Sequence, residues 1–186
     1  MGKLIYGMMV SLDGFVETAN RDLDWAIVDE ELHTFVNEQE REIGTFLYGR
    51  KLYEVMTYWE TADQNPSISA YELEYARIWK STPKLVFSRT LERVEGNARL
   101  SREVVAEEIA KLKRSLDHDL GLGGPTLAAA FSRLGLIDEY RLYVHPVVLG
   151  SGAPFWPAQD NRLSLRLVET RTFGSGVVYL CYQLAG

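Results

Sequence analysis

The sequence predicts an α/β domain with a mostly parallel central sheet, helices on both faces and two antiparallel strands at its C-terminal end. Short apolar runs rich in β-forming residues alternate with helical segments along most of the chain. The last two strand-like runs flank the turn Gly-Ser-Gly at 174–176, as in a hairpin. The length of 186 residues suits one full hydrophobic core, and no linker or repeat divides the chain. We therefore expect one domain over residues 1–186.

The first half of the chain contains runs with β-rich composition and runs with apolar residues at helical spacing. The expected strands are 3–10, 45–49 and 84–88, and the expected helices are 29–43, 50–59 and 70–81. Polar residues 11–25 and 61–69 are rich in turn formers, so they are expected to be loops. Acidic residues in the first turn of helix 29–43 favour a helix start there.

The second half continues the alternation and then closes the sheet. The expected helices are 102–116 and 125–135, and the expected strands are 118–122, 139–150, 163–173 and 177–184. Pro125 stands at the first position of its helix, where proline is tolerated, and Gly135 stands at its end. The last two strands form the antiparallel hairpin.

Composition and charge exclude several classes of protein. The net charge of -6 argues against general nucleic-acid binding, which needs a basic face for the phosphates. The single cysteine, Cys181, excludes an internal disulfide framework and argues against a cysteine-ligated metal site. The N-terminus lacks the apolar core of a signal peptide, and no stretch approaches the roughly 20 apolar residues of a membrane span. We expect a cytoplasmic protein with no metal and no membrane partner.

Two strand ends carry residues suited to an anion, and ligands bind α/β sheets at this edge. Gly-Arg-Lys at 49–51 places two cations in the first turn of a helix, against the helix dipole. A bound phosphate would remove that conflict. Ser-Arg-Thr at 88–90 offers a hydroxyl and a guanidinium, which can hold a phosphate monoester. Each motif taken alone is equally typical of a solvated turn.

A third strand end places two adjacent glycines, Gly123 and Gly124, before a helix. Because glycine costs backbone entropy, we expect a tight turn, an unusual peptide geometry or a phosphate close to the backbone. The segment is not a Walker A loop, since no Gly-Lys-Ser/Thr follows, and Thr126 stands where a Rossmann fingerprint needs its third glycine. Close packing of the helix on the strand is the structural alternative.

Five segments together resemble the dihydrofolate-reductase-like superfamily, and most closely the reductase domain of the bifunctional deaminase–reductase of riboflavin biosynthesis and its stand-alone relatives. These segments are MVSLDGFV at 9–16, GRKLYE at 49–54, FSR at 87–89, GGPTLAAAF at 123–131 and GLIDEYRLYVHPVVLGSGAPFW at 135–156. No H-x-E or P-C-x-x-C zinc motif occurs, so only the reductase half is represented. The resemblance implies a dihydrofolate-reductase-like fold and an NADPH-dependent reductase that acts by hydride transfer.

The resemblance also implies which residues bind the cofactor. Gly49, Arg50 and Lys51 would bind its phosphates, and Ser88 and Arg89 would bind the adenosine 2′-phosphate. The residues expected around the pyrophosphate and the nicotinamide are Gly123, Gly124, Pro125, Thr126 and Leu127. In relatives the paired glycines are joined by a cis peptide bond.

The substrate is expected to bind beside the nicotinamide, under the loop of residues 11–25. In this arrangement Asp13 would lie near the cofactor and Trp25 toward the substrate. The next helix would turn Asp29 or Glu30 into the pocket, and we predict Glu30 as the catalytic carboxylate that orients the heterocycle or relays a proton. Acids at a helix start are equally typical of the helix dipole alone.

Three functions remain open at this point. The first is a 5-amino-6-(5-phosphoribosylamino)uracil reductase, although Leu122 stands where riboflavin-pathway reductases often have Glu before the glycine pair. The second is a reductase of the same fold that acts on dihydrofolate, a pterin or another small molecule. The third is a non-catalytic nucleotide-binding module.

The resemblance also implies a homodimer, because relatives dimerise through the region that corresponds to strand 139–150. A long apolar strand such as this one would promote aggregation if it were exposed.

Overall fold

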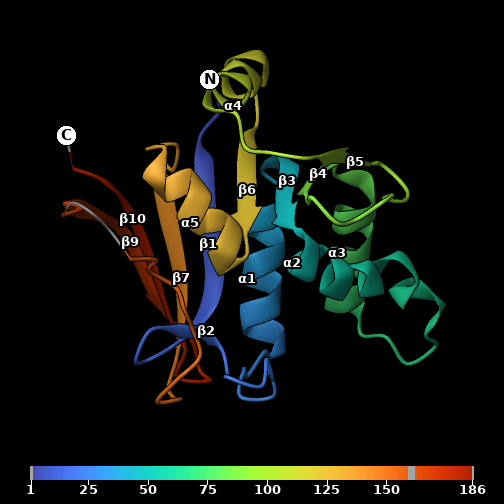
Figure 1. The fold of residues 1–186 in the computed structure, drawn as a ribbon. Coiled ribbons are helices and arrows are strands. Elements are labelled where there is room, and N and C mark those ends of the chain that lie inside the picture. The colour runs from blue at the N-terminus through green and yellow to red at the C-terminus, as the bar shows by residue number, and fades with distance from the viewer. Residues whose placement is uncertain (1, 159–161, 186) are drawn as a thin grey trace.

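A computed structural model describes residues 2–158 and 162–185. Eight strands form one sheet in the order β5-β4-β3-β6-β1-β7-β10-β9 (Figure 1). Every neighbouring pair from β5 to β7 is parallel, whereas β10 runs antiparallel to both of its neighbours. The predicted α/β class, with a mostly parallel sheet and an antiparallel C-terminal hairpin, is confirmed.

The described part of the chain contains one main sheet, one small sheet, five α-helices and two 3₁₀ turns. The strands of the main sheet are β1 Leu4–Ser11, β3 Ile43–Gly49, β4 Lys84–Phe87, β5 Ala98–Ser101, β6 Asp119–Gly123, β7 Glu139–His145, β9 Leu165–Thr172 and β10 Val178–Leu184. Two short strands, β2 Phe15–Glu17 and β8 Ala153–Pro154, pair separately. The helices are α1 Glu30–Glu40, α2 Arg50–Met56, α3 Ala70–Ser81, α4 Ala106–Ser115 and α5 Pro125–Arg133, with 3₁₀ turns η1 Thr57–Glu60 and η2 Ala62–Gln64.

Helices cover both faces of the sheet because successive side chains of a strand point to opposite faces. Tyr6 of β1 belongs to the core cluster that contains Phe131 of α5. Its neighbour Ile5 belongs to the cluster that contains Trp79 of α3, and Phe35 of α1 packs in a third cluster against β7 and β10. The sheet is therefore the middle layer of three.

Helix α3 begins and ends where the sequence predicts. The Ser69 hydroxyl accepts from the Glu72 N–H, and the Glu72 carboxylate accepts from the Ser69 N–H, which forms a capping box. Pro83 follows two residues after the helix. Helix α1 ends at Glu40 and not at residue 43, because Ile43 already pairs with Asp119 in the sheet.

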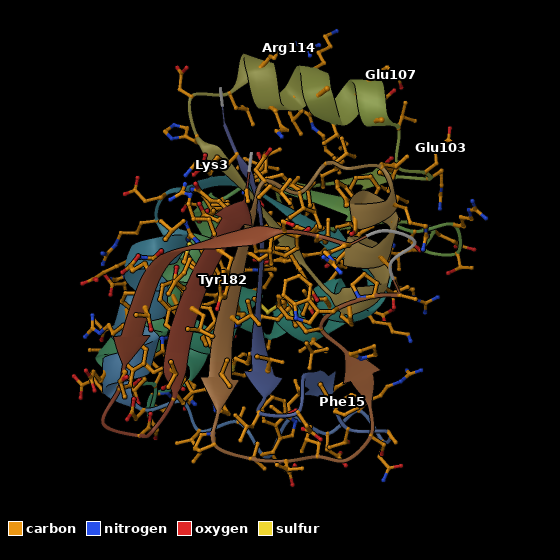
Figure 2. All side chains as sticks on the ribbon, turned by 90° about the vertical axis from the view of Figure 1, so that its left-hand side faces the viewer. Lys3, Phe15, Glu103, Glu107, Arg114 and Tyr182 are labelled. Carbon is orange, nitrogen blue, oxygen red and sulfur yellow. The ribbon has the colours of Figure 1, made fainter. Side chains whose placement is uncertain are left out.

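The predicted strand 139–150 is too long. Strand β7 ends at His145, five residues before the predicted end, because Pro146 has no N–H for a ladder. Strand β7 also lies between β1 and β10, so it is an interior strand. The exposed edge on this side is β9, which faces the viewer in Figure 2 together with β10. Strand β5, at the other edge, was not expected from its mixed composition.

In the described part of the chain, no helix has the length and apolar character that a membrane span requires.

Candidate active site

Three neighbouring parallel strands, β4, β3 and β6, end side by side. Gly49 at the end of β3 pairs with Phe87 of β4, and the preceding Tyr48 pairs with Gly123 of β6. This register brings Gly-Arg-Lys at 49–51, Ser-Arg-Thr at 88–90 and the glycine pair at 123–124 to one edge of the sheet. Helices α2 and α5 leave β3 and β6 at this edge (Figure 1).

Side chains would be strained at both positions of the glycine pair at the end of β6, for different reasons. A Cβ atom on Gly123 would lie 2.4 Å from Leu52 Cδ2 of α2. Gly124 has a φ of +92°, a backbone conformation that L side chains rarely adopt. No described residue follows a cis peptide bond, so the expected cis bond between the glycines is absent, and the chain turns at Gly124 instead. The Gly124 N–H donates to the sulfur of Met8 at 3.4 Å.

Helix α5 begins directly after this turn without a side-chain cap. Gly124 is its N-cap residue and Pro125 its first residue. Thr126 is exposed, whereas Leu127 is buried and packs beside Gly49, where an added Cβ would lie 3.7 Å from Leu127 Cβ. No described side chain caps the start of this nine-residue helix, where the N–H groups after Pro125 have no partner within the helix.

Arg50 links α2 to the turn after β4. Its Nε donates to Glu54 Oε1 at 2.7 Å, and its Nη1 donates to Thr90 Oγ1 at 3.0 Å. Arg50 therefore contacts Thr90, the residue directly after Arg89. Both arginines and Lys51 are exposed, so three cations surround the end of β3 and the turn after β4.

A set of hydrogen bonds shapes the turn at residues 88–91. The Ser88 hydroxyl accepts from the N–H groups of Thr90 and Leu91 at 3.2 and 3.0 Å, which leaves its own proton available to a ligand. The Arg102 guanidinium donates to the carbonyls of Ser88 and Leu91 at 3.0 and 2.6 Å. Sequence reasoning did not find Arg102, because it lies beyond β5, and strand pairing alone brings it to this turn.

Asp13 holds two loops together at the ends of β1 and β7. Its carboxylate accepts from the Ser11 hydroxyl at 2.7 Å and from the N–H groups of Leu149 and Gly150 at 3.0 and 2.7 Å. These bonds, the Ser11 bond first, lower the pKa of Asp13 below its ordinary value. Both carboxylate oxygens are occupied within the protein, so Asp13 braces the site.

Trp25 covers His145 at the end of β7. The two rings meet edge to face with centroids 5.4 Å apart, and the indole N–H donates to the Asp22 carbonyl at 3.1 Å. His145 is fully buried, and its Nδ1 accepts from the Ile27 N–H at 3.2 Å. Burial lowers the pKa of this imidazole, so it stays neutral. The residues before α1 are thereby fastened to the sheet.

The acidic start of α1 differs from the sequence prediction. Asp29 is the N-cap residue, and its carboxylate accepts from the Leu32 N–H at 2.9 Å. This carboxylate therefore caps the helix. Glu30 is exposed, and the expectation of a carboxylate withdrawn from water at this position is wrong. The reason is the helix start: Leu32 turns into the core, which leaves Glu30 on the outer side. Glu31 accepts from the Gly174 N–H at 3.0 Å.

Four aromatic side chains gather beside α1, and the sequence assigned them no role together. His33 of α1 lies with its ring centroid 5.0 Å from Tyr71, 5.7 Å from Tyr75 and 6.1 Å from Trp59. The members come from α1, α3 and η1, so no local spacing in the sequence could have grouped them. The cluster is half-buried and adjoins the α2 side of the site.

A hollow of about 540 Å³ lies at the opposite edge of the sheet, among residues that include Thr45, Asn97 and Leu112. Lys84 borders it, but the ammonium group lies over the Trp79 ring, 3.8 Å from its centroid, and donates to the Trp79 carbonyl. Among the described residues, no group of three His, Cys, Asp or Glu side chains could hold a metal ion.

The fold and the site define the class of protein. The chain has the dihydrofolate-reductase-like α/β fold, with a glycine turn and a cation cluster at the carboxyl ends of its parallel strands. It belongs to the RibD C-terminal domain family, whose model matches residues 2–179.

Individual relatives agree with this family. The chain is 38% identical over 187 residues to the uncharacterized protein YyaP of Bacillus subtilis, which covers 99% of this chain and 96% of YyaP. A putative riboflavin biosynthesis protein from Shewanella sp. PV-4 superposes over 100% of both chains with a TM-score of 0.78 and 20% identity.

Two further solved structures share the fold at lower similarity. The first is the diaminohydroxyphosphoribosylaminopyrimidine deaminase/5-amino-6-(5-phosphoribosylamino)uracil reductase of Thermotoga maritima, with a TM-score of 0.65 and 15% identity over 99% of this chain and 57% of that one. The second is the dihydrofolate reductase of Enterococcus faecalis, complexed with NADP(H), with a TM-score of 0.65 and 16% identity over 100% of this chain and 98% of that one.

Proposed function

We propose that this protein is an NADPH-dependent reductase that transfers a hydride to a small heterocyclic substrate. The observation that carries the proposal is the glycine turn at Gly123 and Gly124, which opens α5 without a side-chain cap, beside the cations of α2 and of the turn after β4. The family supports it, since the Thermotoga maritima relative is named a reductase and the Enterococcus faecalis enzyme was solved with NADP(H).

The residues present fit a dinucleotide with a 2′-phosphate. Without side chains at the glycine pair, a pyrophosphate can approach the N–H groups that open α5. Arg50 and Arg89 would hold the 2′-phosphate together with the Ser88 hydroxyl. When bound, NADPH supplies the hydride, and the protein supplies position and electrostatics.

The protein's own residues would orient the reacting rings and limit the access of water. Leu52 packs against the glycine turn, Met8 accepts its N–H, and Trp25 and His145 anchor the residues that lie before α1.

Arg50 and Arg89 are exposed at adjacent strand ends, and this pair of cations favours a functional cofactor site over a non-catalytic module. Arg50 would exchange its surface ion pair with Glu54 for the phosphate. The exposed position of Glu30 gives no support to a catalytic carboxylate there.

The test is cofactor choice, measured by calorimetric titration. We expect NADPH to bind about tenfold to a hundredfold more tightly than NADH, because a lost charged contact costs roughly 1.5–3 kcal/mol. Arg89→Ala should narrow this difference. Arg93→Ala is the matched control, since Arg93 is an exposed arginine in the same connection and pairs only distantly, at 4.0 Å, with Glu95. Equal affinities of the parent protein for NADPH and NADH would refute the proposal.

A further inference from the structure

The His33 imidazole is held in one orientation by its neighbours. Trp59, Tyr71 and Tyr75 surround the ring, and its Nδ1 lies 3.2 Å from Asn37 Oδ1. Burial is the main reason why the pKa of His33 lies below its ordinary value. The ring is therefore neutral at pH 7.

The hydrogen bonds of Asn37 determine which ring nitrogen of His33 carries the proton. Asn37 is fully buried, and its Nδ2 donates to the Tyr71 carbonyl at 2.8 Å and to Glu74 Oε2 at 3.1 Å. Its Oδ1 therefore faces His33 as an acceptor, so Nδ1 of His33 is the donor and Nε2 holds a lone pair. Among the described residues Nε2 has no partner, and unlike Nε2 of His145 it is not sealed from solvent.

A continuous apolar strip joins His33 to the glycine turn. Leu52 packs beside Gly124, and Leu52, Met56 and Trp59 follow one another along α2 and η1 in one cluster. The rise per residue places Trp59 about 11 Å from Leu52. A substrate about 11 Å long that lay along this strip, with its reacting ring at the glycine turn, would place its far end at His33.

The charges around His33 are negative. Glu72 and Glu74 of α3 act on its imidazole, and Glu30 is exposed one turn earlier on α1. Arg41 pairs with Glu74, whereas no ion pair among the described residues neutralises Glu72 or Glu30. A phosphate at this place would meet carboxylates and an imidazole lone pair, both of which repel it.

We infer that His33 determines the substrate specificity of the proposed reductase: its Nε2 accepts a hydrogen bond from a hydroxyl or N–H at the far end of the substrate, and this end carries no phosphate. The position of the substrate's reacting ring rests on the proposed function. The position of the substrate's far end rests on the His33 cluster. It departs from the phosphoribosyl substrate that the Thermotoga maritima enzyme is named for.

A matched pair of probes tests the inference by equilibrium binding. The probes are 5-amino-6-(ribosylamino)uracil and its 5′-phosphate, titrated calorimetrically into the whole protein without cofactor. We expect the riboside to bind at least about tenfold more tightly than the phosphate. His33→Phe keeps an aromatic ring but removes the acceptor, so riboside affinity should fall about tenfold. His33→Gln should restore part of it, since an amide can donate to Asn37 and still accept from the ligand.

His118→Phe is the control for the substitution itself. His118 is exposed at the opposite edge of the sheet, beside Gly44, so this variant should leave both affinities unchanged.

Three results would each overturn the inference. They are tighter binding of the 5′-phosphate than of the riboside, no binding of the riboside, and unchanged riboside affinity in a folded His33→Phe variant. If His33→Phe does not fold, the preference of the parent protein between the two probes decides. A separate NADPH titration distinguishes failure of the inference from failure of the proposed function. If the protein binds NADPH but prefers the 5′-phosphate probe, only the inference is refuted. If it prefers the riboside but does not bind NADPH, only the proposed cofactor is refuted.

Discussion

At the scale of single residues, Gly123 and Gly124 explain why the chain places so little side chain before α5. At Gly123 a Cβ would crowd the tip of the Leu52 side chain, 2.4 Å away, so Leu52 would have to shift. Gly124 is required by its backbone conformation, with φ at +92°. The two requirements are independent, so each glycine can be tested alone.

Gly124→Ala should both destabilise the fold and impair cofactor binding. We expect a loss of about 1–3 kcal/mol in the free energy of unfolding, the usual cost of a strained backbone, and a fall of about tenfold or more in NADPH affinity. Gly135→Ala is the control, since Gly135 also has a positive φ, +64°, with open space around it at the far end of α5. Urea unfolding and calorimetric titration measure the two effects. Equal NADPH affinities in both variants would contradict the assignment of the glycine turn.

His145 gives the fold a dependence on pH that can be assigned to one residue. Burial lowers its folded pKa, and its Nδ1 must stay unprotonated to accept the Ile27 N–H. A group with a lowered folded pKa contributes stability above its unfolded pKa, about 6.5 for histidine, and this stability is lost as the pH falls through the folded value. His145→Phe should therefore lose less stability than the parent between pH 7 and pH 5, in urea unfolding at each pH. An equal or steeper loss would show that the imidazole is not the titrating group.

At the scale of elements, the turn after β4 is shaped by a residue from outside it. Arg102 follows β5, and its guanidinium holds the carbonyls of Ser88 and Leu91. This bond pattern presents Arg89 and the Ser88 hydroxyl at the strand end. Positioning of the turn is thus a property of the β4–β5 pair as a whole.

Removal of the Arg102 side chain should loosen this turn and weaken cofactor binding indirectly. We expect Arg102→Ala to lower NADPH affinity about threefold to tenfold, because its hydrogen bonds to backbone are each worth roughly 1 kcal/mol. The amides of Thr90 and Leu91 should exchange their hydrogens faster, which a role confined to ligand contact would not cause. Arg99→Ala, an exposed arginine on β5, is the control. Unchanged amide exchange in Arg102→Ala would rule out the positioning role.

At the scale of the whole molecule, the sheet has one long exposed edge beside the antiparallel hairpin. Strand β9, at the edge that faces the viewer in Figure 2, is exposed along almost its entire length. Leu167 and Val168 are about half exposed, at 47% and 46%. Charged residues such as Arg166 and Glu169 also stand on this strand, and charge limits uncontrolled pairing of an edge. Strand β7, whose length suggested an interface, is covered on both sides.

The homodimer stays a prediction, and the topology moves its expected interface from β7 to β9. We expect light scattering at micromolar protein to give twice the mass of the chain. Val168→Lys should shift the mass toward the monomer, because it adds a charge to the edge that would be buried between copies. Thr126→Lys, at an exposed position on α5, serves as the control. A monomer mass for the parent protein would contradict the prediction.

The sequence alone determined the features that depend on near neighbours in the chain. The helical pattern and Pro83 predicted α3 with its observed bounds, and the glycine pair marked the start of α5. The fold class followed from the order of strands and helices, and the motifs at 49–51, 88–90 and 123–127 lie at the strand ends of the candidate site. Local propensity and backbone conformation are set by adjacent residues, so a single sequence contains them.

Only the tertiary structure decided which residues lie together and which are turned away. Strand order and helix packing bring Arg102 and Met8 to the candidate site, and His33 to its aromatic cluster, over separations at which the sequence carries no periodic signal. The same packing turned Leu32 inward and left Glu30 in solvent, where the acidic helix start alone allowed either direction. These outcomes depend on contacts between distant segments, whose energies add up only once the sheet has formed.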